Sequence, residues 1–209
     1  MKLFDREVVD RFVDVASVVL ISVAAVLTAL CGYQSGRWSG EQARYYNVTN
    51  ANRIDSSEAS AKANMLTEID IALFLQYIDA MDRGDSRKAR FIERRFRPEM
   101  RPAMKAWLAS EPEANPKAPT SPFVMPQYSL ATRVEAERFD REAGASFEKA
   151  RVANEHADNF LLLTVIFAGV SFLGGVSTKM AFPRHAILIA LGTIGLVYGA
   201  IRLVELPFI

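Results

Sequence analysis

The sequence has little of the chemistry that most catalytic and metal-binding sites require. Its 209 residues include one cysteine, Cys31, and two histidines, His156 and His185. A single cysteine excludes a disulfide within the chain and any site built from several cysteines. The Glu-x-x-His pair of helical carboxylate metal sites is also missing, because Ala153 stands three residues before His156. No nucleophile elbow, phosphate-binding loop or dinucleotide fingerprint is present, so we expect no catalytic residue, no cofactor and no metal, and we predict a protein that is not an enzyme.

Net charge is nearly absent as well, at 25 basic against 24 acidic residues, but the charges are unevenly distributed. Three apolar stretches, 15–36, 160–178 and 186–201, contain no charged residue. A helix needs roughly 20 apolar residues to cross about 30 Å of hydrocarbon. The first two stretches meet this length, and the third does so if Arg202 reaches the headgroups. The sequence therefore predicts an all-α polytopic membrane protein with transmembrane helices at 15–36, 160–180 and 186–204.

The basic residues of the short segments predict the orientation. These residues are Lys2, Arg6 and Arg11 before the first span, Lys179 and Arg184 between the second and third spans, and Arg202 at the opposite side. The positive-inside rule places the N-terminus and the turn 181–185 inside the cell, and residues 37–159 and the tail 205–209 outside. In a bacterial inner membrane, where we expect this multi-pass protein, the inside segments would be cytoplasmic and the outside segments periplasmic. The first apolar stretch exceeds the core of a secretory signal, so we expect it to remain as an anchor.

Two segments flank the first span. Residues 1–14 are predicted to form an amphipathic lead-in at the cytoplasmic surface, with Phe4, Val8 and Phe12 four residues apart; the alternative is simply the first turns of the first helix. After the span, Tyr33 and Trp38 are expected as interface anchors. Ser39 and Gln42 match a capping box, so either a new helix begins near residue 40 or the first helix continues out of the membrane.

The central insert is predicted to be helical, with a proline-rich connector. One apolar stripe has helical spacing and consists of Leu66, Ile69, Leu73, Tyr77 and Ala80. We expect Gly84 to end this helix, Asp85 to cap a second helix over 86–96, and a short third helix over 102–109. Residues 110–127 contain five prolines and predict an extended connector. Its apolar piece, 122–126, favours a strap packed on the helices over a segment that binds a partner.

A second stripe predicts helix pairing. Its members are Ala136, Phe139, Ala143, Phe147, Ala150, Ala153, Ala157 and Phe160, with a mean spacing close to the 3.5 residues of a coiled coil. We expect one long helix over 128–182, antiparallel to the extension of the first span, with Ala143, Phe147 and Ala150 as packing residues. In the third span, Gly195 and Gly199 form a GxxxG pattern that fits close packing on the protein's own spans or on another chain.

The segment 83–105 is strongly basic, with nine basic and three acidic residues. The candidate contacts for a partner or an anionic surface are Arg87, Lys88, Arg90, Arg94, Arg95, Arg97, Arg101 and Lys105. Anionic lipid headgroups, envelope polymers and an acidic protein are candidate partners, whereas nucleic acid is not expected outside the cell. The alternative is a solvated helical face paired with acids elsewhere in the insert, which is balanced at 19 basic and 19 acidic residues over 37–159.

Three segments, Gly32-Tyr33-Gln34-Ser35-Gly36-Arg37-Trp38-Ser39-Gly40-Glu41-Gln42, Arg95-Phe96-Arg97-Pro98-Glu99 and Asn115-Pro116-Lys117-Ala118-Pro119, resemble a family of uncharacterised bacterial inner-membrane proteins with three spans. The resemblance covers nearly the whole chain and implies the same layout, but it carries no activity. We expect a scaffold or accessory subunit that acts through helix association, with membrane lipids and either further copies of itself or another membrane protein as partners. The alternatives are a sensor with an outer helical domain, which is an analogy at the level of the fold, and an oligomeric pore.

Overall fold

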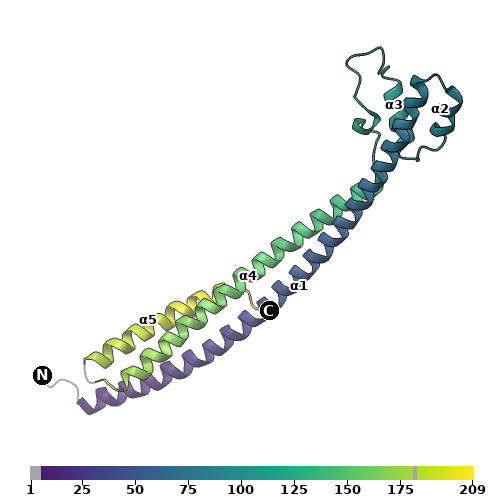
Figure 1. The fold of residues 1–209 in the computed structure, drawn as a ribbon. Helices are drawn as coiled ribbons and strands as arrows, with labels where there is room; N and C mark the ends of the chain where they lie inside the picture. Colours follow the sequence, from purple (N-terminus) through teal and green to yellow (C-terminus); the bar gives the residue numbers. More distant parts are fainter. Residues whose placement is uncertain (1–5, 181–182) are drawn as a thin grey trace. The chain divides into compact units, whose positions relative to one another are not determined.

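The computed structural model describes residues 6–180 and 183–209, and the side chains of 14–180 and 183–209. Its elements, labelled in Figure 1, are α1 (Arg6–Asp82), α2 (Ser86–Glu93), α3 (Met100–Leu108), the 3-10 turn η1 (Pro122–Val124), α4 (Ala131–Ser177) and α5 (Arg184–Glu205). No strand occurs in these ranges, which confirms the all-α prediction. The helices α1, α4 and α5 are long and apolar enough to cross a membrane, as the three predicted spans require.

The chain divides into two compact units. The first unit is Met1–Asn47 with Ser146–Ile209, and the second unit is Val48–Ala145. The first unit therefore contains the three apolar stretches, and the second contains the basic segment and the connector. Both α1 and α4 contribute residues to each unit.

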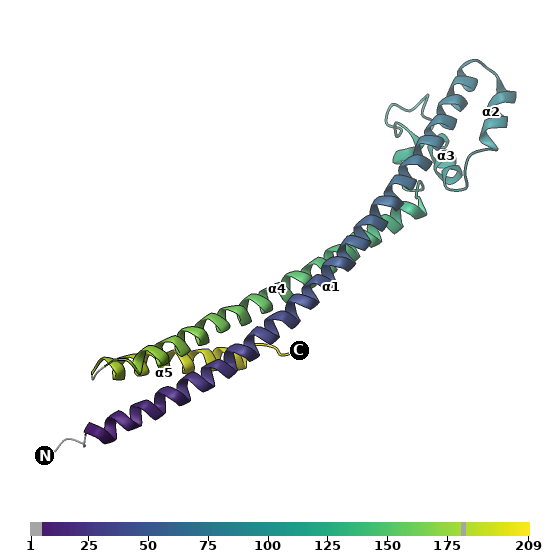
Figure 2. The same cartoon turned by 60° about the horizontal axis from the view of Figure 1, so that its bottom comes forward.

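In the first unit, polar side chains join α1 to α4 at intervals. The contacts are Ser17 Oγ with Ser177 Oγ at 3.0 Å, Ser35 Oγ with the carbonyl of Ala157 at 3.0 Å, and Gln42 Nε2 with Asn154 Oδ1 at 2.8 Å. Residue numbers thus rise along α1 as they fall along α4. Between these contacts lies a core that includes Leu20 and Ala24 of α1 and Phe160, Phe167 and Val170 of α4. Figure 2 shows the same helices from a second direction.

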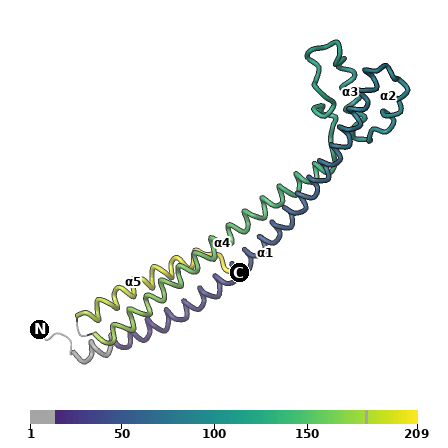
Figure 3. Tube along the Cα trace, in the orientation of Figure 1, coloured from purple at the N-terminus to yellow at the C-terminus, as the bar shows by residue number. Residues whose placement is uncertain are grey.

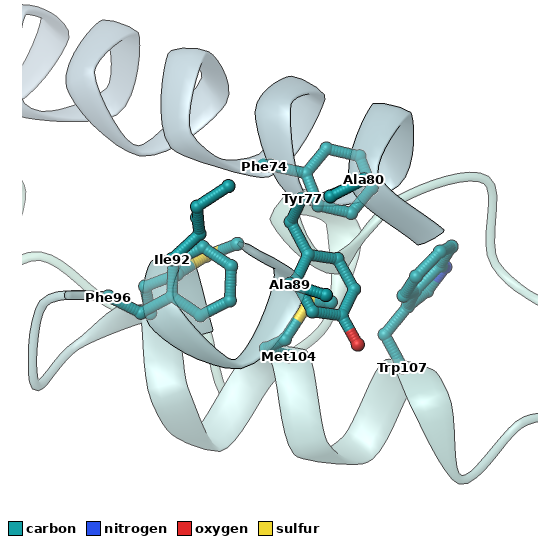
Figure 4. Close-up of a cluster of buried hydrophobic side chains, with 9 residues drawn as sticks. Phe74, Tyr77, Ala80, Ala89, Ile92, Phe96, Met104 and Trp107 are labelled. Carbon is teal, nitrogen blue, oxygen red and sulfur yellow. The ribbon is translucent and has the colours of Figure 1, made fainter. Parts of the chain in front are cut away.

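The second unit has an aromatic core. Figure 4 shows side chains of α1, α2, α3 and the turn between α2 and α3 that meet there. The buried members of this core are Phe74, Tyr77, Ala80, Ala89, Ile92, Phe96, Met100, Met104 and Trp107. The connector between α3 and α4, traced in Figure 3, packs on this core through Phe123, Met125 and Tyr128. Trp107 Nε1 also donates a hydrogen bond to the carbonyl of Pro119 at 2.8 Å. The connector is therefore a strap on the helices, as its apolar piece predicted.

Some helix ends match the sequence prediction and others differ, and α2 ends at Glu93 instead of the predicted residue 96. The helix α1 continues through residue 40, and Ser39 Oγ donates to the carbonyl of Ser35 at 2.9 Å instead of capping a new helix. Gly84 adopts φ +72° after α1, and Asp85 accepts from the amide of Lys88 at 2.9 Å, so the predicted stop and cap are confirmed. The helix α3 begins two residues before Pro102, because a proline in the first turn removes an amide that needs no helical partner.

Two predicted segments fall partly outside the described residues. Phe4 of the amphipathic lead-in and positions 181–182 of the turn are not described, nor are the side chains of Val8 and Phe12. The helix α4 spans Ala131–Ser177, within the predicted range 128–182, and α5 extends the predicted third span by one to two residues at each end.

Candidate functional site

A carboxylate lies in the core of the second unit, where the sequence predicted an isoleucine. The apolar stripe placed Ile69 inside, but its side chain is 45% exposed, and Asp70 is completely buried instead. Positions 66, 70, 73, 77 and 80 have the alternating four- and three-residue spacing of a coiled-coil seam, and residue 70 belongs to that seam. The hydrophobic pattern misses Asp70, because a buried charge is acceptable only where partners from elsewhere in the chain reach it.

Asp70 joins three segments through its Oδ2 atom. Tyr128, at the end of the connector, donates its hydroxyl to Oδ2 at 3.0 Å. Arg97, in the turn between α2 and α3, places Nη1 at 3.4 Å from the same oxygen and Nη2 at 3.1 Å from Glu99 Oε2. Among the described residues, Asp70 Oδ1 has no hydrogen-bond donor. This cluster, Asp70, Arg97, Glu99 and Tyr128, is called the buried polar cluster below.

Burial dominates the electrostatics of the buried polar cluster. It raises the pKa of Asp70, while the Tyr128 hydroxyl and the Arg97 guanidinium oppose the increase and the Glu99 charge adds to it. Burial likewise raises the pKa of Tyr128. With a tyrosine kept in its neutral form and a carboxylate whose pKa is raised, the arrangement connects α1 to the α2–α3 turn. These contacts support a structural role for the cluster.

The candidate basic contacts fall into three groups. Arg97 is an internal residue, because its side chain is only 20% exposed and is paired with Asp70 and Glu99, so we remove it from the predicted contact surface. Lys88 lies 3.6 Å from Asp79 at the surface. The other six have no acidic oxygen within 4.0 Å in the described part of the chain: Arg87, Arg90, Arg94, Arg95, Arg101 and Lys105. Acids within the insert therefore pair with only two of the eight candidates.

A cavity of about 520 Å³ opens between the end of α2 and α3. Its cations are Arg94, Arg101 and Lys105, and its apolar lining is Phe96, Met104 and Leu108. Arg101 is held in place by two backbone carbonyls, since Nε donates to Phe96 O at 2.9 Å and Nη2 donates to Arg94 O at 3.2 Å. We call this feature the cation-lined cavity.

The GxxxG pair of α5 faces the protein's own helices. A Cβ atom built on Gly199 would lie 2.6 Å from Cε1 of Phe167, and one on Gly195 would lie 3.0 Å from Cγ2 of Val170. Both contacts are with α4 of the same chain. Of the two alternatives that the sequence left open, these glycines therefore fit the packing of α5 on the chain itself.

Phe147 differs in burial from the two alanines predicted with it as packing residues of α4. Ala143 and Ala150 are buried, whereas Phe147 is 37% exposed and its ring centroid lies 6.1 Å from that of Tyr46. The partly buried residue between the two alanines is Ser146. The sequence analysis selected Phe147 because it is large and hydrophobic. The more buried residue is Ser146, one position earlier.

The two predicted interface anchors have different surroundings. Tyr33 is exposed and accepts a hydrogen bond from Arg37 Nη1 at 3.3 Å. Trp38 donates from Nε1 to the carbonyl of Pro207 at 3.0 Å, so it holds the C-terminal residues against α1.

Gln34, which the sequence analysis did not select, makes two bonds to the backbone of one residue. It donates from Nε2 to the carbonyl of Ile209 at 3.1 Å and accepts from the Ile209 amide at 3.2 Å. The available signal in the sequence was a glutamine near the end of the uncharged stretch 15–36, because a polar side chain that becomes buried needs a hydrogen-bond partner.

The second unit also carries an exposed stripe that the sequence analysis missed. On α1, its members alternate in spacing of three and four residues: Ala51, Ile54, Glu58, Ala61, Met65, Glu68, Ala72 and Leu75. All eight are exposed, and the large apolar members Ile54, Met65 and Leu75 are 60%, 54% and 60% exposed. We call this set the outer stripe.

Comparison with known protein families, with curated proteins and with solved structures found no match to this chain. Two features of its second unit remain as candidates for function, the outer stripe and the cation-lined cavity.

Proposed function

We propose that the protein is a non-enzymatic scaffold or accessory subunit of a bacterial inner membrane that associates with another membrane protein through α1. The three apolar helices anchor it, with the N-terminus in the cytoplasm and the second unit in the periplasm as an antiparallel helical insert. The outer stripe is the single observation on which this proposal depends. Helix association in the periplasm requires such a face, because the exposure of apolar side chains to water is unfavourable and a partner helix removes it.

The position of the outer stripe on α1 indicates a further helix. The buried seam of α1 in this unit includes Ala63, Asp70 and Tyr77, seven residues apart. In that repeat the outer stripe occupies the positions opposite the buried seam, which are normally polar in a two-stranded coil. Here six of the eight are apolar, and the stripe keeps the 3.5-residue period from Ala51 to Leu75. A period that matches the coiled-coil repeat keeps the stripe on one face and lets a partner helix follow it.

The acidic members of the outer stripe favour a different protein over a second copy. Two copies anchored in one membrane with the same topology run in the same direction. A symmetric pair would then bring Glu58 against Glu58 and Glu68 against Glu68, and like charges at such positions destabilise the pair. A helix of another protein that presents Lys or Arg opposite these glutamates would pair with them. Three alanines of the stripe, Ala51, Ala61 and Ala72, allow close approach of its backbone.

Site-specific photo-crosslinking in native membranes tests this proposal. A photoreactive residue at Ala61, Met65 or Leu75 is expected to link the chain to one other polypeptide. The matched controls are Ser57 and Gln76, which are exposed on the same helix but lie beside the outer stripe. We expect weak or no crosslinking at the two controls.

Other outcomes would contradict the proposal in distinguishable ways. Equal crosslinking at all five positions would show random collision and no helical face. Crosslinks to a second copy would replace the other protein with a homo-oligomer. A protein that stays a strict monomer in native nanodiscs and crosslinks to nothing would contradict the scaffold itself.

A further inference from the structure

We propose that the cation-lined cavity binds an anionic amphiphile, a molecule with a phosphate-bearing head and a hydrocarbon tail. The inference is independent of the outer stripe, because the two features share no residue. Arg94, Arg101 and Lys105 would contact the head, and the apolar lining would contact the tail.

The cations are positioned for an anion from outside the chain. Arg94 and Lys105 have no acidic oxygen within 4.0 Å among the described residues, and neither does Arg101. The two backbone carbonyls that hold Arg101 accept from Nε and Nη2, so these contacts fix the guanidinium without neutralising it. A cation that is already ordered loses less entropy when it binds a phosphate. Glu93 also lines the cavity, which leaves a net charge of +2 among its lining side chains.

The other side of the cavity is apolar. Phe96 and Met104 belong to the buried core seen in Figure 4 and form the floor of the cavity, at 1% and 2% exposed. Leu108, at 39% exposed, is the apolar lining residue that a ligand can reach. Hydrocarbon placed against Leu108 leaves water, which contributes roughly 25 cal/mol for each Å² of apolar area buried. Cations on one side and apolar side chains on the other match the two ends of an amphiphile.

The size of the cavity favours a small amphiphile over an acidic polypeptide. A volume of about 520 Å³ lies within the range of small-molecule pockets. A flat basic face would suffice for an acidic protein, whereas a cavity with an apolar wall adds recognition of a tail. The same chemistry could reach the site as a dissolved single molecule or as a lipid within a bilayer, and the experiment separates these two sources.

The experiment uses the full chain in nanodiscs of zwitterionic phosphatidylcholine. The dissolved probe is dihexanoyl-phosphatidylglycerol below its micelle concentration, and dihexanoyl-phosphatidylcholine and glycerol phosphate serve as comparisons for charge and for tail. Binding is measured by calorimetry, and cosedimentation with phosphatidylglycerol vesicles measures the bilayer source. The test variant is Arg94→Gln with Lys105→Gln. The matched control is Arg87→Gln with Arg90→Gln, which removes the same charge from the same basic segment outside the cavity.

We expect the anionic probe to bind more tightly than both comparison probes. The R94Q/K105Q variant should lose at least about tenfold in affinity, because two charge-assisted contacts are removed, and the R87Q/R90Q control should change by less than about twofold. Leu108→Ser should weaken binding of dihexanoyl-phosphatidylglycerol and leave glycerol phosphate unaffected. Binding of the dissolved probe without vesicle binding would assign the site to free molecules, and both together would assign it to membrane lipid.

Three results would overturn the inference. Equal losses in the two double variants would mean that only net charge matters. Equal affinity for the anionic and zwitterionic probes would exclude recognition of the head. Tighter binding of a glutamate-rich peptide than of dihexanoyl-phosphatidylglycerol, lost in R94Q/K105Q, would assign the cavity to an acidic protein.

Discussion

Asp70 is the residue whose surroundings differ most from its sequence context. It lies between Ile69 and Ile71, yet it is buried while both isoleucines are exposed. A buried carboxylate requires partners, and Tyr128 and Arg97 supply them from two other segments. Because each partner comes from a different part of the chain, the buried polar cluster fixes how α1, the α2–α3 turn and the connector align.

Asp70 predicts a pH dependence of stability. Its pKa is raised in the folded protein, so its contribution to stability is complete below the ordinary aspartate pKa of about 3.9 and is lost as the pH rises through the folded value. The Asp70→Asn variant stays uncharged and should lack this loss. We expect the free energy of unfolding of the variant to rise relative to the unmodified protein as the pH is raised from below about 4.

Urea unfolding of the two proteins at a series of pH values measures this difference. Asp82→Asn is the control, since Asp82 is an exposed aspartate at the end of the same helix. A difference between Asp70→Asn and the unmodified protein that stays constant with pH would contradict the interpretation.

At the scale of the elements, the glycines of α4 and α5 differ in how closely a neighbouring helix approaches them. Gly199 of α5 and Gly174 of α4 have side chains of neighbouring helices within 3 Å of a built Cβ atom. Gly169 and Gly175 of α4 have nothing within 4 Å. Close approach between helices therefore depends on particular glycines and not on their number.

This contrast predicts that glycine-to-alanine substitutions at Gly199 and at Gly175 have different effects on the free energy of unfolding. Gly199→Ala places a methyl group against the buried ring of Phe167 and should lower the free energy of unfolding by about 1–3 kcal/mol. Gly175→Ala meets open space and should leave stability unchanged or raise it by up to about 1 kcal/mol, because alanine favours the helix. Unfolding in mixed micelles of increasing SDS fraction measures both. Equal effects of the two substitutions would show that α5 does not pack on Phe167.

At the scale of the whole molecule, the predicted orientation in the membrane depends on where the charges lie in the sequence. The short predicted cytoplasmic segments are rich in Lys and Arg, and residues 37–159 are balanced. The second unit contains six basic residues, Arg87, Arg90, Arg94, Arg95, Arg101 and Lys105, that have no acidic partner within the part of the chain that the structure describes. The side of the membrane on which that unit lies therefore decides which anionic partners can reach it.

The orientation can be tested with reporter fusions. Alkaline phosphatase fused after Asn115 and at the C-terminus is expected to be active at both positions, and green fluorescent protein at the same positions is expected to be dark. The reason is the positive-inside bias of the short segments. A fluorescent fusion after Asn115 would mean that residues 37–159 lie in the cytoplasm, opposite to the prediction. Nucleic acid would then become a candidate partner again.

Features that depend on neighbours in sequence were predictable from the sequence. Uncharged runs of bilayer length indicated the three apolar helices, and Gly84 with Asp85 indicated where α1 ends and α2 begins. Each of these depends on composition or on bonds within a few residues. The proline-rich strap and the alanines of the α4 seam were predictable for the same reason.

Features that depend on contacts between distant residues were decided only by the tertiary structure. Asp70 took the buried position predicted for Ile69, because Arg97 and Tyr128 reach it from 27 and 58 residues away. The same kind of contact made Arg97 an internal residue and brought Gly195 and Gly199 against α4 of the same chain. A sequence pattern records the hydrophobicity and spacing of side chains, whereas the energy of burying a charge or removing a side chain depends on which atoms lie opposite.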